Sequence, residues 1–108
     1  MADRRASGGR KSDSKERQAA AEALAIATLS FIAAEPERLA RFLAVTGLAP
    51  QSIRAAAREP GFLAGVLDHV AGDERLLVAF AAESGRDPDE VMWARAALAG
   101  GHWERELP

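Results

Sequence analysis

Apolar side chains recur every three or four residues along most of the chain, the spacing of one face of an α-helix. A clear case is the series Leu63, Val66, Leu67 and Val70. No segment sustains the two-residue alternation of a half-buried β-strand. The pattern predicts an all-α protein folded as a compact bundle of about six short helices.

Prolines and acidic residues mark where these helices begin. Proline suits the first position of a helix, where the missing N–H would have had no partner. On this basis helices are expected over residues 36–46, 50–58, 60–71 and 88–99. Two more are expected to start at Asp13, which has capping-box spacing to Glu16, and at Asp73.

Glycines mark the predicted helix ends. Gly47, Gly72 and Gly85 each follow a predicted helix, and glycine adopts the left-handed conformation of that position without strain. The short connections lead us to expect that consecutive helices pack as neighbours. The expected core comprises Leu24, Leu29, Ile32, Leu39, Phe42, Leu43, Leu48, Ile53, Leu63, Val66, Leu67, Val70, Leu76, Leu77, Phe80, Val91 and Leu98.

A weak internal repeat appears when the chain is shifted by 38 residues. The shift places Phe42 on Phe80 and Gly47 on Gly85, among other pairs. One interpretation is a duplicated three-helix unit. The other is that any two helices joined by a glycine and a proline look alike, because helix ends demand those residues. The sequence leaves both open.

Charge divides the chain into an arm and a body. Residues 1–17 hold six basic and three acidic residues, and the remainder holds 8 and 13, so the body carries a net charge of −5. Residues 1–12 also have almost no large apolar side chains, which predicts a disordered basic arm. We expect a helical domain over residues 13–101 and a flexible tail over residues 102–108.

Composition excludes several classes of protein. The chain has no cysteine, so it has neither disulfides nor a thiolate site, which fits a reducing compartment such as the cytoplasm. The apolar stretch over residues 23–34 is too short to span a bilayer, and no membrane association is expected. The segment 7–12 has a lysine and a serine after glycines but lacks the spacing of a phosphate-binding loop.

The polar residues do not form a recognisable catalytic or metal site. Asp68, His69 and Asp73 could cluster, yet His69 is better explained as a half-exposed residue at the edge of an apolar stripe. The acidic residues at 87, 89 and 90 fit a capping box and first-turn charges. We therefore expect no enzyme activity, no cofactor and no metal.

Three sequence motifs carry a family resemblance. They are Glu35-Pro36-Glu37-Arg38-Leu39, Glu59-Pro60-Gly61-Phe62-Leu63 and Thr46-Gly47-Leu48, with further matches up to Phe80-Ala81. Through them the stretch 17–101 resembles an alphaproteobacterial family known as domain of unknown function 3572. The resemblance implies no activity, ligand or site residue.

The first hypothesis for function is a non-enzymatic module that works by protein contacts, as an adaptor or a homodimer. The first helix is apolar nearly all round, with Leu24 and Phe31 on one side, so either it faces a partner or it is the central helix of the bundle. Trp93 falls off the apolar face of the last helix, as interface tryptophans do, although it could instead cover the arm or the tail.

The alternative is a nucleic-acid-binding protein. The spacing of apolar residues and glycine over residues 42–56 is typical of a helix-turn-helix, aided by the basic arm. On that interpretation Gln51, Ser52, Arg54 and Arg58 would face DNA. The negative body opposes it.

Overall fold

Six α-helices and one 3₁₀-helix make up the fold. The computed structural model describes the backbone of residues 2–106 and the side chains of residues 15–99, and that range contains no strand. The elements are α1 (Ala2–Ala33), α2 (Pro36–Thr46), η1 (Pro50–Ser52), α3 (Ile53–Ala56), α4 (Pro60–Ala71), α5 (Glu74–Ser84) and α6 (Pro88–Glu106). The all-α class predicted from the sequence is confirmed.

Most predicted helix starts lie at the expected residue. Pro36, Pro60 and Pro88 each open a helix, because a ring with no N–H and a fixed φ costs nothing there. Helix α5 starts after Asp73, whose Oδ1 accepts a hydrogen bond of 3.2 Å from the backbone N–H of Leu76. That bond pairs one of the free N–H groups of the first turn.

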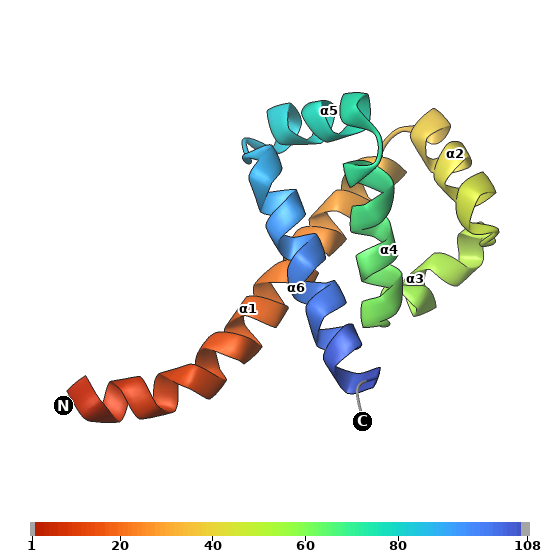
Figure 1. Ribbon diagram of the computed structural model, residues 1–108. Coiled ribbons are helices and arrows are strands. Elements are labelled where there is room, and N and C mark those ends of the chain that lie inside the picture. Colours follow the sequence, from red (N-terminus) through yellow and green to blue (C-terminus); the bar gives the residue numbers. More distant parts are fainter. Residues whose placement is uncertain (1, 107–108) are drawn as a thin grey trace.

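The lengths of three predicted helices are wrong. The helix expected over residues 50–58 is a 3₁₀-turn followed by one short α-helix that ends at Ala56. Helix α1 begins at Ala2 and runs through Asp13, which is therefore no cap, and its N-terminal part projects from the bundle (Figure 1). Helix α6 continues past residue 99 to Glu106. The flexibility of the arm and the tail stays a prediction, since their side chains lie outside the described residues.

Two of the three helix-ending glycines have the predicted conformation. Gly47 has φ 75° and Gly85 has φ 70°, and the N–H of each donates to the carbonyl four residues earlier. Gly72 contradicts the prediction, because its φ of −82° is right-handed. There the chain passes directly into the Asp73 cap without needing a left-handed residue.

Helix α1 is the centre of the bundle. Its C-terminal half packs against α6 and α4, and α4 also packs against α6 (Figure 1). Ala21, Ala25 and Ala94 are fully buried in this region, and small side chains let helix axes approach closely. The buried hydroxyl of Thr28 donates to the carbonyl of Leu24 at 2.8 Å, so it remains hydrogen-bonded inside the core.

Most of the predicted core is buried. The buried members are Leu24, Leu29, Ile32, Phe42, Leu63, Val66, Leu67, Val70, Phe80, Val91 and Leu98. The others are half-buried, namely Leu39, Leu43, Leu48, Ile53, Leu76 and Leu77. The prediction missed Phe31, which is buried against α5, and the buried alanines.

The helix limits follow the 38-residue repeat. Helices α2 and α5 each have 11 residues, start 38 residues apart and end at the two left-handed glycines. Equivalent positions in α1 and α4 are also buried together, as Leu29 and Leu67 are. Shared cap chemistry and a common helical period give the same correspondence, so duplication stays a prediction.

Candidate functional site

The outer face of α6 carries an exposed apolar strip. The inner face of this helix buries Val91, Ala94 and Leu98. On the opposite side Met92 is 41% exposed and Trp93 is 43% exposed, and the exposed Ala96 and Ala99 follow at helical spacing. We call these four residues the α6 strip. Trp93, one of the residues predicted from the sequence to contact a partner, is accessible.

The two partner-binding residues predicted on the first helix are not accessible. Leu24 and Phe31 are both buried within the chain. The ring of Phe31 packs edge-on against Phe80 with centroids 5.3 Å apart, and the guanidinium of Arg38 lies 4.0 Å above it. Their burial favours the central-helix alternative, since α6, α4 and α2 pack against α1 and Phe80 of α5 covers Phe31.

The predicted helix-turn-helix lacks a recognition helix. The four residues expected to face DNA are divided between η1, α3 and the turn after it. Gln51, Arg54 and Arg58 are exposed and Ser52 is half-buried. An α-helix of four residues is too short to lay several side chains along a major groove. The geometry on which the DNA-binding alternative depended is therefore not formed.

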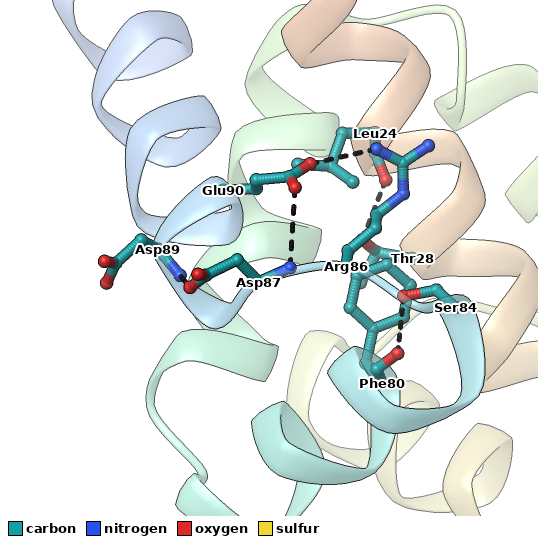
Figure 2. A network of polar contacts seen from close by, with 8 residues as sticks. All are labelled: Leu24, Thr28, Phe80, Ser84, Arg86, Asp87, Asp89 and Glu90. Atoms are coloured by element: carbon teal, nitrogen blue, oxygen red, sulfur yellow. Dashed lines mark hydrogen bonds and ion pairs between the residues drawn. The ribbon is translucent and has the colours of Figure 1, made fainter.

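The acidic residues near the start of α6 act as a helix cap, as predicted. The backbone N–H of Asp87 donates to Glu90 at 3.4 Å, and Asp87 accepts from the N–H of Asp89 at 2.9 Å (Figure 2). Arg86 pairs with Glu90 at 3.1 Å. These contacts satisfy first-turn N–H groups and account for the whole cluster.

Asp68, His69 and Asp73, which the sequence could have brought together, do not form one metal-binding group. Asp68 pairs instead with Arg95 of α6, and Asp73 caps α5. Among the residues that the structure describes, no group of three or more histidine and acidic side chains is placed to hold a metal ion.

A groove lies between α2 and α5. Helix α2 packs on α1 and helix α5 packs on α4 and α6, and the two do not pack along each other (Figure 1). The ion pair between Arg38 and Glu83, 3.3 Å long, bridges the two helices. The groove encloses about 320 Å³. Its lining residues are Glu37, Arg38 and Arg41 from α2, His69 from α4, Asp73 at the cap, and Arg75, Leu76 and Ala79 from α5.

His69 lines the groove at the end of α4. Its ring meets Phe42 edge-on, with centroids 5.2 Å apart. Burial lowers the pKa of His69 below 6.5, the nearby Asp73 carboxylate raises it, and the positive charge of Arg41 lowers it, with burial the strongest effect. The lowered pKa favours the neutral imidazole, which can donate one hydrogen bond and accept another.

The basic residues of this groove could not be recognised as a group from the sequence. Arg38 and Arg41 lie on α2, Arg75 lies on α5 34 to 37 residues further along the chain, and the three share no motif. Their proximity depends on how α2 packs on α1 and α5 packs on α4, which no local sequence signal reports. His69 was noted together with Asp73, which does line the groove, and with Asp68, which pairs with Arg95 instead.

None of the described helices is, on its own, both long and apolar enough to cross a bilayer. The segment Lys15–Ala33 together with Pro36–Thr46 reaches that length and hydropathy only as a pair, which is bent by 116°.

Comparison with known proteins identifies a family. No curated protein and no solved structure matches the chain. A family model does match, over residues 18–101, which include the C-terminal half of α1, the groove and the α6 strip. The chain thus belongs to the family described as "Protein of unknown function (DUF3572)".

Proposed function

We propose that this protein is a small non-enzymatic interaction module that pairs with a second copy of itself through the α6 strip. The observation that carries the proposal is the adjacent exposure of Met92 and Trp93 on the outer face of a helix whose inner face is fully packed. Tryptophan and methionine are enriched at protein interfaces, and tryptophan often contributes a large share of the binding energy.

The composition of the strip favours a second copy as the partner. Its two large side chains are followed by Ala96 and Ala99, which leave room for an approaching helix. A two-fold axis brings the same patch of both subunits together, so an uncharged strip is compatible with itself. In the adaptor alternative, the same residues would contact a different protein instead of a second copy.

The cellular setting belongs to the same proposal. The absence of cysteine suits a reducing compartment, and the family resemblance points to a bacterium, so we place the protein in the bacterial cytoplasm. The excess of negative charge on the body disfavours nucleic acid as the main partner.

Light scattering during size exclusion tests the proposal. We expect a dimer for the wild type and a monomer for Trp93→Glu, because a charge in the centre of an apolar contact is not compensated. Circular dichroism should show both folded, since Trp93 is 43% exposed in the single chain. The matched control is Val45→Glu, since Val45 on α2 is 69% exposed. This variant should remain a dimer.

A monomeric wild type at high protein concentration would contradict self-association. A pull-down from the source cell, with and without nuclease, would then distinguish the adaptor role from binding to nucleic acid. Loss of a captured protein with Trp93→Glu but not with Val45→Glu would assign that role to the α6 strip.

A further inference from the structure

The groove between α2 and α5 concentrates positive charge in a protein whose body is acidic. Three guanidinium groups line it, those of Arg38, Arg41 and Arg75. Arg38 is engaged, because it pairs with Glu83 and covers the ring of Phe31. Within residues 15–99, no carboxylate lies within ion-pair distance of Arg41 or Arg75. Two cations with no ion-pair partner among the described side chains therefore share one cavity.

The two carboxylates in the lining do not offset these cations equally. Asp73 is held by the N–H of Leu76 as the cap of α5. Glu37 lies four residues before Arg41 on α2, a spacing at which the two side chains can meet after a rotation. The Glu37 carboxylate thus competes with a bound anion for Arg41, and the anion would displace it.

The rest of the lining suits a small ligand with one apolar portion. Leu76 and Ala79 form the α5 wall, and the neutral imidazole of His69 supplies a polar group beside them. The volume of about 320 Å³ is at the small end of the range for ligand pockets. Guanidinium groups match the paired oxygens of carboxylates and phosphates better than any other side chain does.

We propose that this groove is a binding site for a small carboxylate or phosphate anion, held between Arg41 and Arg75 with His69 beside it. The site is independent of the α6 strip, since none of its lining residues belongs to α6.

The imidazole of His69 provides a direct reporter of occupancy. An anion bound next to it stabilises the protonated ring and offsets the effect of Arg41, so the pKa of His69 should rise on binding. The other charged groups around the ring are Asp73 and the charged groove residues Glu37, Arg38 and Arg75. Asp68 is the neighbour of His69 in the chain. The chain has only one further histidine, so the signal can be assigned with His69→Gln.

The experiment is an NMR titration of the His69 ring with inorganic phosphate and, separately, with succinate, in each case against sodium chloride of the same ionic strength. We expect a saturable shift with at least one of the two anions and a higher His69 pKa in its presence. A saturable shift with only one of the two anions would show whether the groove binds phosphates or carboxylates.

Matched variants connect that response to the groove. Arg41→Gln and Arg75→Gln should each weaken binding about tenfold, the usual effect of losing a charge-assisted hydrogen bond. Glu37→Gln should strengthen it by removing the competitor. Arg54→Gln, an exposed arginine on α3, should leave it unchanged.

Two results would overturn the proposal. One is an NMR shift of the His69 ring that rises linearly with either anion and equals the shift in sodium chloride. Such a shift reports ionic strength and not binding. The other is saturable binding that Arg41→Gln and Arg75→Gln leave intact while circular dichroism shows the variants folded.

Discussion

Replacing Phe31 by alanine tests whether α1 is the central helix of the fold. Phe31 is only 8% exposed and packs edge-on against Phe80. Removing a buried phenylalanine costs about 3 to 5 kcal/mol, which includes the loss of the aromatic pair. In a domain of this size that cost lowers the melting temperature by at least about 12 °C. Urea and thermal unfolding followed by circular dichroism would measure both.

The control for this prediction lies on the same helix. Ile26 is 47% exposed, so Ile26→Ala should cost about 1 kcal/mol or less. Alanine is a better probe at position 31 than a charged residue, because Arg38 lies 4.0 Å from the ring and would pair with a new carboxylate. Equal losses for Phe31→Ala and Ile26→Ala would refute the central position of α1.

Three further predictions concern pH, glycine and the arm. Because folding lowers the pKa of His69, the unfolded chain binds the proton first as the pH falls, so the free energy of unfolding should decrease below pH 6.5. The urea midpoint of His69→Gln should depend less on pH than that of the wild type. Gly47→Ala should cost about 1 kcal/mol at its left-handed φ of 75°, whereas Gly65→Ala, inside α4 with open space around it, should stabilise by about 0.5 to 1 kcal/mol in thermal melts. Deleting residues 1–12 should leave the melting temperature nearly unchanged, and a large drop would show that this segment docks.

Helix starts were predictable because they depend on local chemistry. A proline at a first turn needs no tertiary partner, and Pro36, Pro60 and Pro88 begin helices as expected. The length of a helix depends on what covers it, so the segment after Pro50 stops after two short turns although its start was right. Gly72 shows the same limit, since the cap that follows it decides its conformation.

The surfaces of the molecule were less predictable. Trp93 could be placed off the packed face of α6 because a helix repeats every 3.6 residues. Phe31 could not be assigned, since its burial depends on α5, which lies far along the chain. The same holds for the groove, whose basic residues meet only when α2 packs on α1 and α5 packs on α4.

The packing of α1 against α6 has a consequence for synthesis on the ribosome. The apolar half of α1 is made early, yet the residues of α6 that cover it, up to Leu98, are made late. At about 5 to 20 residues per second, that half-helix stays uncovered for several seconds while the intervening chain is translated. The nascent protein therefore cannot close its core until α6 has emerged, which makes the central helix a natural target for chaperones that recognise exposed apolar segments.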